Sequence, residues 1–512
     1  MSNATRIIKN TGFLYAKMGV TIFILLYSTR LILAALGISD YGIYNVVGGA
    51  IAMLSFLNST MANATQRFMS YSLGENDIEK CKQIFNISII LHVAIALLTA
   101  ILLLVAILPL FGGVLNIPKD RISSAKIVYL CMVFSSLLTI INVPYEALIN
   151  SHENMFYYAI VGILDSLLRL GVAFCCVYSP IDKLVVYGVL MALIPIVMLI
   201  IMNVYCRKHY EECVFTPKRY WDSGKAKEML AFSSWSFLTA ISYLLTSSGL
   251  GIVLNHFFGT ILNTAQGIAN QLNGYLTSIS LQLSRAITPV IVKKAGAGNM
   301  DSMNNITVAS CKFTTYLVLL FAVPCIIEMP YILGLWLGVV PDWAVLFCIL
   351  QLSQTIITQM GASITMAIFA QGNIKKYTIF KSITNILPLF LVYISFSMGG
   401  GPVWLYLPMI VVWAIGGNIV VIACAKSLCS LSICSFLRGV LLPVSCVTLF
   451  TFLFGSIPHF LLQQGFLKLL CCVSMTTFGF IISVYFVGMN RDERKLLLRF
   501  RKTLINKYIC TK

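Results

Sequence analysis

Long apolar runs separated by short polar loops fill most of this chain. A helix needs about 20 apolar residues to cross a bilayer, and counting runs of that length predicts fourteen membrane helices. The expected ranges are 13–36, 42–66, 84–111, 124–149, 155–178, 183–205, 232–257, 262–292, 307–335, 343–370, 376–398, 403–425, 436–458 and 465–489. The pattern therefore predicts an all-α integral membrane protein.

The composition supports this interpretation. Of 512 residues, 59% are hydrophobic and only 11% are charged, which is too much apolar surface for a water-soluble core. The first apolar run is too long for a signal-peptide core and contains Arg30, so we expect it to remain as a membrane span. The sixteen cysteines fall mostly inside apolar runs without Cys-x-x-Cys spacing, which favours buried reduced thiols over a zinc site or disulfides.

A weak internal repeat divides the chain into two similar halves. An offset of 222 relates Gly37 to Gly259, Asn63 to Arg285 and Gly74 to Gly296. A second offset, of 219, relates residues 150–154 to residues 369–373. Repeats of this kind predict two lobes, and transporters built from repeats usually bind substrate between them.

The positive charge lies in short loops, so the net charge of +18 indicates membrane topology and anionic headgroups and does not indicate nucleic acid. The predicted outside loops hold few basic residues, namely Lys119, Arg121, Lys126, Lys183 and Lys468. We therefore expect a multi-pass protein with both termini in the cytoplasm. The predicted divisions are a first lobe at 1–205, an amphipathic cytoplasmic linker at 206–231, a second lobe at 232–425, two added helices at 426–490 and a basic cytoplasmic tail at 491–512.

Sequence signatures of catalysis are missing. The chain contains no phosphate-binding Gly-rich loop with Lys-Ser or Lys-Thr, no His-Glu-x-x-His and no large soluble domain. We expect a protein that is not an enzyme, uses no cofactor or metal, and draws its energy from a gradient, the membrane potential or the substrate.

Ionisable residues inside membrane helices are costly and mark candidate functional positions. Arg30 has no acid within one turn, so its partner is Asp40, another helix or an anionic ligand. Asp165 and Arg169 are four residues apart on one helical face, which predicts a self-neutralised pair or a site of ion coupling. Glu146 and Glu328 are expected near helix ends in solvated or capping roles, and Lys17 is expected to extend to the membrane surface.

The predicted eighth helix carries a polar stripe. Gln266, Asn270, Asn273, Thr277, Ser280 and Ser284 follow spacings of three and four residues, and Arg285 lies beside the end of the stripe. A polar stripe in lipid must face protein or water, so it is either a contact between packed helices or the wall of a hydrated cavity.

Four segments resemble a known family. They are NTGFLYAKMGVTIFILLYSTRLILAALGISDYGIYNVVGG, NATQRFMSYSLGE, EMLAFSSWSF and NTAQGIANQLNG. They resemble the polysaccharide flippases of the multidrug/oligosaccharidyl-lipid/polysaccharide exporter superfamily, and most of all the O-antigen flippases called Wzx in Bacteroides-like bacteria. The resemblance covers nearly the whole chain and identifies a family better than a substrate.

The resemblance implies a MATE-like fold, with two six-helix lobes in a V around a central cavity and two further helices. It implies alternating-access export of an undecaprenyl-pyrophosphate-linked oligosaccharide across the bacterial inner membrane, with Arg30, Arg67 and Arg285 as candidates to bind the pyrophosphate. Membrane lipids, a polysaccharide polymerase and a ligase are the expected partners of a monomer. A cation-coupled drug exporter and a peptidoglycan-precursor flippase remain as alternatives.

Overall fold

The structure is a computed structural model that describes residues 3–52, 55–114, 117–491 and 493–495. The chain forms two compact units. The N-unit consists of residues 9–237 with 296–298, and the C-unit holds the remainder, so the chain changes unit between Phe237 and Leu238. Most of the basic tail predicted at 491–512 lies outside the described residues.

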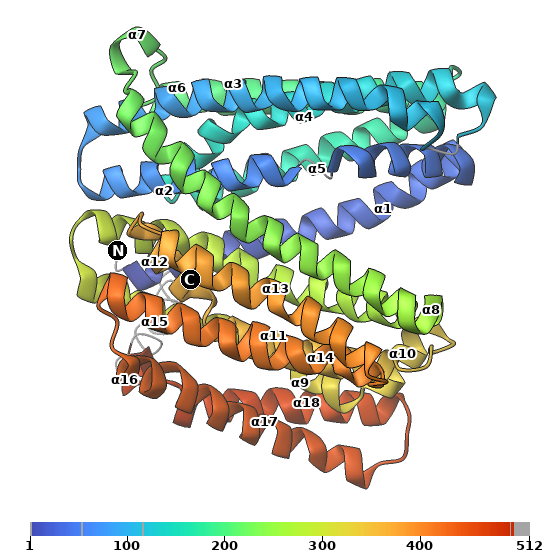
Figure 1. Ribbon diagram of the computed structural model, residues 1–512, viewed down its shortest axis with the longest axis vertical. Coiled ribbons are helices and arrows are strands. Elements are labelled where there is room, and N and C mark those ends of the chain that lie inside the picture. The colour runs from blue at the N-terminus through green and yellow to red at the C-terminus, as the bar shows by residue number, and fades with distance from the viewer. Residues whose placement is uncertain (1–2, 53–54, 115–116, 492, 496–512) are drawn as a thin grey trace, which may run out of the picture. The chain divides into compact units, whose positions relative to one another are not determined.

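Helices account for both units (Figure 1). The first half of the chain forms α1 (Asn3–Ala52), α2 (Ser55–Gly74), α3 (Ile78–Pro109), η1 (Leu110–Val114), η2 (Lys119–Arg121), α4 (Ile122–Ser151), α5 (Met155–Tyr178), α6 (Lys183–His209), α7 (Pro217–Tyr220) and the start of α8 (Ser223–Gly296).

The second half continues with α8 and the helices that follow it. These are α9 (Met300–Ile327), α10 (Met329–Leu337), α11 (Ala344–Gln359), α12 (Ala362–Ala370), α13 (Lys375–Ser397), η3 (Pro402–Leu405), α14 (Tyr406–Pro408), η4 (Met409–Gly416), α15 (Gly417–Cys429), α16 (Ile433–Phe436), η5 (Leu437–Leu441), α17 (Leu442–Leu461), α18 (Phe466–Ser483) and η6 (Val484–Gly488).

The all-α membrane fold is confirmed. Within the described residues, twelve helices are long and apolar enough to cross a membrane, and each corresponds to one predicted span. The predicted spans without a counterpart among these twelve are 42–66 and 262–292, the two most polar ones. Both ranges are nevertheless mostly helical, because α1 and α2 cover the first and α8 covers the second. The ninth span was predicted to reach 335, but α9 ends at Ile327 and α10 begins after Glu328.

The repeat is visible in the backbone. Gly37 interrupts α1 with φ 74° and ψ 172°, and Gly259 interrupts α8 with φ 75° and ψ −169°. Only glycine adopts this conformation without strain, since a Cβ atom would collide with the backbone. The same break therefore occurs at positions related by the 222-residue offset.

The segments after these helices match as well. Asp77 caps α3 by accepting a hydrogen bond from the Lys80 amide at 2.9 Å, and Asn299 caps α9 by accepting one from the Ser302 amide at 3.0 Å. Each cap follows a residue of positive φ, Asn76 or Gly298. The repeat predicted from sequence thus extends to the start of the third helix of each half.

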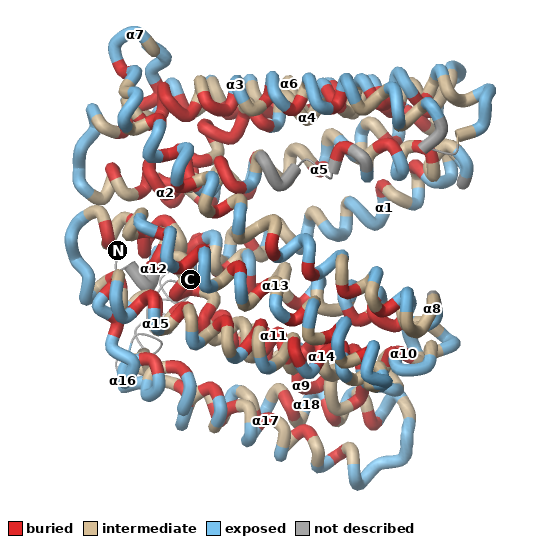
Figure 2. The backbone as a smooth tube through the Cα atoms, in the orientation of Figure 1, coloured by how far each residue is buried: buried red, intermediate tan, exposed pale blue. Residues whose placement is uncertain are grey.

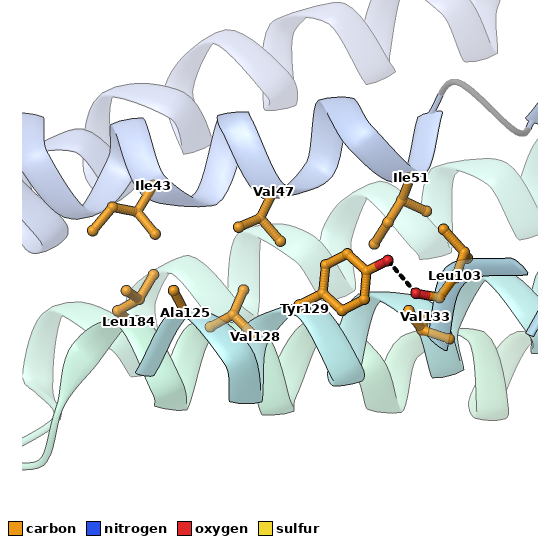
Figure 3. Packing of buried hydrophobic residues seen from close by; sticks show 9 residues of the cluster. All are labelled: Ile43, Val47, Ile51, Leu103, Ala125, Val128, Tyr129, Val133 and Leu184. Atoms are coloured by element: carbon orange, nitrogen blue, oxygen red, sulfur yellow. Dashed lines mark hydrogen bonds between the residues drawn. The ribbon is translucent and has the colours of Figure 1, made fainter. Parts of the chain in front are cut away.

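The core of the N-unit forms where the second part of α1 packs on α3, α4 and α6. Figure 3 shows the side chains that meet there, with Tyr129 donating a hydrogen bond to the Leu103 carbonyl at 2.7 Å. The cluster comprises Ile43, Val47, Ile51, Leu103, Ala125, Val128, Tyr129, Val133 and Leu184. It fixes α1 beyond the Gly37 break against its own unit.

The last two long helices of the C-unit, α17 and α18, are held to α9 by buried charge. Glu328 is 1% exposed and accepts a hydrogen bond from His459 of α17 at 2.7 Å. Lys468 of α18 lies 3.6 Å from the same carboxylate oxygen, and Cys472 donates to it at 3.4 Å. The expectation of a solvated Glu328 is therefore wrong, because residues more than 130 positions away cover it. Lys468, expected in an outside loop, is likewise buried.

A second buried ion pair joins α9 to the end of this hairpin. Lys312, 1% exposed, donates a hydrogen bond to Glu493 at 2.6 Å, and Tyr316 donates one to the Gly488 carbonyl at 3.2 Å. The two charged contacts involve different ends of the α17–α18 segment, so the added helices belong to the C-unit.

Substituting the glycine at either helix break tests its role. Gly37→Ala and Gly259→Ala should each lower the free energy of unfolding by about 2 kcal/mol, because alanine is strained at these dihedral angles. Gly12→Ala is the matched control within α1, where an added Cβ meets nothing within 4 Å and should leave stability unchanged or slightly raised. Thermal unfolding in detergent measures the difference. Equal behaviour of all three variants would contradict the assigned role.

Neutralising Glu328 tests the docking of the terminal hairpin. Glu328→Gln leaves the Lys468 ammonium buried without its counter-ion, so we expect a loss of about 3 kcal/mol and faster hydrogen exchange in α17 and α18. Glu79→Gln is the control, because Glu79 pairs with Lys82 on the surface and should change little. Unchanged exchange in the hairpin of the Glu328 variant would show that apolar packing alone holds it.

Candidate functional site

Two adjoining cavities lie inside the N-unit. Their volumes are 350 Å³ and 220 Å³, and Thr139, Arg169 and Pro195 line both. The larger is mainly bordered by hydroxyl and apolar side chains. The smaller is bordered by four ionisable residues, Lys17, Glu146, Asp165 and Arg169. Two cations and two carboxylates give this cavity wall a balanced formal charge.

The Asp165–Arg169 pair predicted from sequence is present. Arg169 Nε donates to Asp165 Oδ2 at 2.8 Å, and a second guanidinium nitrogen donates to Oδ1 at 3.2 Å. This two-point contact joins residues one helical turn apart on α5 and neutralises both. The suggested role of the pair in ion coupling stays a prediction.

Lys17 and Glu146 are the other two charged residues at the smaller cavity. Lys17 Nζ lies 4.0 Å from the centre of the Tyr158 ring, and Glu146 accepts a hydrogen bond from Asn142 at 3.3 Å. Both are half-buried and border the smaller cavity, and Glu146 lies five residues before the end of α4 at Ser151.

Asp40 is not the partner of Arg30. Its carboxylate is held by Arg121, whose Nε donates at 2.9 Å and whose terminal nitrogen also bonds to it. Arg121 also donates to Asp182 at 3.0 Å and 3.1 Å, and Ser124 donates to Asp182 at 2.7 Å. This network joins α1, α4 and the residue before α6. Arg30 is exposed on α1 and, among the described residues, makes no hydrogen bond or ion pair.

Arg67 differs from Arg30 in its surroundings. It is 8% exposed, and its guanidinium lies 4.4 Å from the ring centre of Phe68, 4.9 Å from that of Tyr71 and 5.7 Å from that of Phe232. Such cation–π contacts hold an arginine in a packed position. Its predicted role in substrate binding is untested, and its burial favours a structural contribution.

Only some residues of the polar stripe on α8 contact neighbouring helices. Gln266 and Ser280 are buried, Asn273 accepts a hydrogen bond from Thr355 of α11 at 2.6 Å, and Ser280 donates to the Thr314 carbonyl of α9 at 3.5 Å. These residues serve as contacts between packed helices of the C-unit. Asn270 is exposed, Thr277 and Ser284 are half-buried, and Arg285 is exposed at the end of the stripe. Their role in substrate binding stays a prediction.

Sequence reasoning missed the polar face of α4. Ser135, Thr139, Asn142 and Glu146 line the cavities and follow spacings of four, three and four residues. The signal is the same as that of the α8 stripe, and it was available in the sequence. It is less visible because serine and threonine are common in apolar runs, where they bond to their own helix, as Thr139 does to the Ser135 carbonyl at 2.9 Å.

Comparison with known proteins identifies the fold. No protein family and no curated protein matches the chain. Among solved structures, MATE in the bent conformation aligns with a TM-score of 0.72 and 15% identity, covering 83% of this chain and 97% of that chain. An outward-facing multidrug resistance MATE family transporter of the MOP superfamily gives 0.67 and 16%, covering 87% and 96%. A MOP superfamily transporter from Pyrococcus furiosus, described as having a binding pocket of reverse polarity, gives 0.66 and 15%, covering 87% and 97%.

The Arg121 network should make the stability of the protein depend on pH. Partial burial would raise the pKa of Asp182, but hydrogen bonds from Ser124 and Arg121 outweigh it and lower this pKa below its usual value. A lowered pKa gives stability that is complete above about pH 5 and is lost as the pH falls below about 4. Asp182→Asn should therefore lower the free energy of unfolding at neutral pH by less than about 1 kcal/mol at this partly exposed site. In thermal unfolding, its difference from wild type should shrink in acid.

Asp120→Asn is the matched control because it removes an exposed carboxylate beside Arg121. It should show no such convergence. A gap between wild type and the Asp182 variant that stays constant from pH 7 to about pH 3 would contradict the assigned network.

Proposed function

We propose that this protein is a flippase that moves an undecaprenyl-pyrophosphate-linked oligosaccharide from the inner to the outer leaflet of a bacterial cytoplasmic membrane by alternating access. The observation that carries the proposal is the positive charge of Arg30, which no acid among the described residues neutralises. Two acids of the N-unit are already engaged by other arginines, Asp40 by Arg121 and Asp165 by Arg169. An exposed arginine on an apolar helix with no partner among the described residues suits an anion supplied by the substrate.

The substrate's chemistry fits this residue. A pyrophosphate carries its charge into the membrane, and arginine remains protonated there and binds phosphate oxygens through paired N–H groups. Arg285, exposed on α8, is the second proposed contact. The sugars need hydrogen-bonding groups, which the exposed and half-buried members of the α8 stripe, Asn270, Thr277 and Ser284, would supply. The polyprenyl tail can stay in hydrocarbon throughout.

A cation-coupled drug exporter is the second candidate. The cavity bordered by Glu146 and Asp165 favours it, since exporters of this kind use membrane carboxylates to bind sodium or protons. Against it, Asp165 is already neutralised at 2.8 Å by Arg169, so a cation would have to displace a guanidinium. A peptidoglycan-precursor flippase would share the proposed arginines, and its substrate would differ in the group attached to the pyrophosphate.

The proposed function includes a membrane topology, an oligomeric state and a set of partners. We place both termini in the cytoplasm, with a monomer as the transporting species. The lipid-linked glycan and membrane lipids are its direct partners, and a polysaccharide polymerase and a ligase would consume its product.

Removing the proposed anion contacts tests the function. Arg30→Ala and Arg285→Ala should each reduce translocation at least about tenfold, because hydrogen bonds to charged groups contribute about 1.5–3 kcal/mol. Lysine at either position should restore only part of the rate, since it keeps the charge and loses the paired geometry. Translocation is measured as the lectin-accessible fraction of lipid-linked glycan, at matched membrane levels of protein.

Lys119→Ala is the control, because Lys119 is an exposed cation in a loop outside these positions. It should leave the rate unchanged. Full activity of both arginine-to-alanine variants would remove the site assignment, and normal glycan export with lost drug resistance in Asp165→Asn would favour the exporter.

A further inference from the structure

The segment between α6 and α8 joins the ends of two helices that are long and apolar enough to span a bilayer. Residues 210–222 connect α6, which ends at His209, to α8, which begins at Ser223. The hydrogen bonds between the linker and α3 keep it beside these helix ends.

One face of this linker is fixed to the N-unit by hydrogen bonds. The Asn86 side chain of α3 donates to the Val214 carbonyl at 2.7 Å and accepts from the Thr216 amide at 2.8 Å. Asn86 itself is fully buried. This two-point contact determines which way the residue between the two bonded positions, Phe215, can point.

A second set of contacts holds the beginning of the linker. His152, in the turn after α4, bonds to Glu212 at 2.5 Å and stacks on the Tyr210 ring at 4.2 Å. Asn154 donates a hydrogen bond to the Tyr210 hydroxyl at 3.2 Å. Glu212 is 3% exposed, so its negative charge is turned inward and does not contribute to the outer surface.

The outer face combines large apolar side chains with cations. Val214, Phe215 and Trp221 are 42%, 51% and 46% exposed. Lys218 and Arg219 of α7 lie between Phe215 and Trp221 and are exposed, whereas Tyr220 is buried. In Figure 2 the α7 region is mostly in the exposed colour, at the end of the N-unit.

Two further cations, Arg207 and Lys208, are exposed on the last turn of α6. Of the acids in residues 210–222, Glu211 is the one that remains exposed among the described residues. Asp222 is half-buried and caps α8 by accepting from the Gly224 and Lys225 amides at 2.8 Å and 3.2 Å. The outward surface therefore has a clear positive excess.

We propose that Val214–Trp221 is a membrane-surface anchor that inserts Phe215 and Trp221 at the headgroup boundary and binds anionic phospholipid through Arg207, Lys208, Lys218 and Arg219. Aromatic rings favour this depth because they are apolar with a polar edge, and each nearby cation is attracted to the negative surface. The fixed inner face means that the anchor is part of the rigid N-unit. This proposal does not depend on which substrate the protein transports.

The test uses the full-length protein in nanodiscs of phosphatidylcholine that contain either photoactivatable phosphatidylglycerol or photoactivatable phosphatidylcholine. Adducts are located by mass spectrometry. Phosphatidylglycerol should label residues 214–221 more strongly than phosphatidylcholine, and the preference should fall with added salt. Lys218→Glu with Arg219→Glu should reduce this labelling by at least about fivefold, the effect of about 1 kcal/mol for a lost cation.

Lys119→Glu with Lys126→Glu is the matched control, since both lysines are exposed at the start of α4 and outside the anchor. It should leave labelling of 214–221 unchanged. Equal labelling by both lipids would overturn the assignment of an anionic ligand. Absence of lipid adducts on this segment would overturn the anchor itself.

Discussion

Charge inside an apolar helical protein is costly unless a nearby partner matches it, and this constraint explains the position of several ionisable residues in both units. Arg169 is matched by Asp165 within one helix. Arg121 is matched by two carboxylates from other segments, and Lys312 and Lys468 are matched by Glu493 and Glu328. These contacts fix helices that apolar packing alone would let slide, because aliphatic side chains contact lipid and neighbouring helices with similar energy. Arg30 departs from the rule, which makes it the clearest candidate for an external anion.

The two units share a backbone plan and use it for different chemistry. Both contain a glycine break of the same geometry and the same capped start of the helix that follows the repeat. The N-unit has adjoining cavities with a charge-balanced wall, whereas the C-unit uses its buried carboxylate at Glu328 to attach two additional helices. The same 222-residue offset aligns Asp40 of the N-unit with Leu262 of the C-unit. The C-unit therefore has no acid at the position that Arg121 binds in the N-unit.

Much of the fold could be predicted from the sequence because local rules determine it. Run length predicted the helices, the offset predicted the matching breaks, and the four-residue spacing predicted the Asp165–Arg169 pair. Contacts between distant positions could not be predicted: nothing local indicates that Glu328 meets His459 and Lys468, or that Asp40 meets Arg121 rather than Arg30. The polar face of α4 that includes Glu146 was present in the sequence and was overlooked, because serine and threonine are common in apolar helices. The likeness to solved transporters at 14–16% identity establishes the fold. The substrate is inferred from the chemistry of the side chains.

The most direct test of the proposed function is mass spectrometry of lipid-linked glycans in cells that lack this protein, combined with an impermeant lectin or glycosidase that reports which leaflet exposes them. The account predicts that an undecaprenyl-pyrophosphate oligosaccharide accumulates on the inner leaflet, that the wild-type protein reverses this, and that the Arg30→Ala variant does not. An unchanged glycan pool, together with new sensitivity to cationic drugs, would contradict the account.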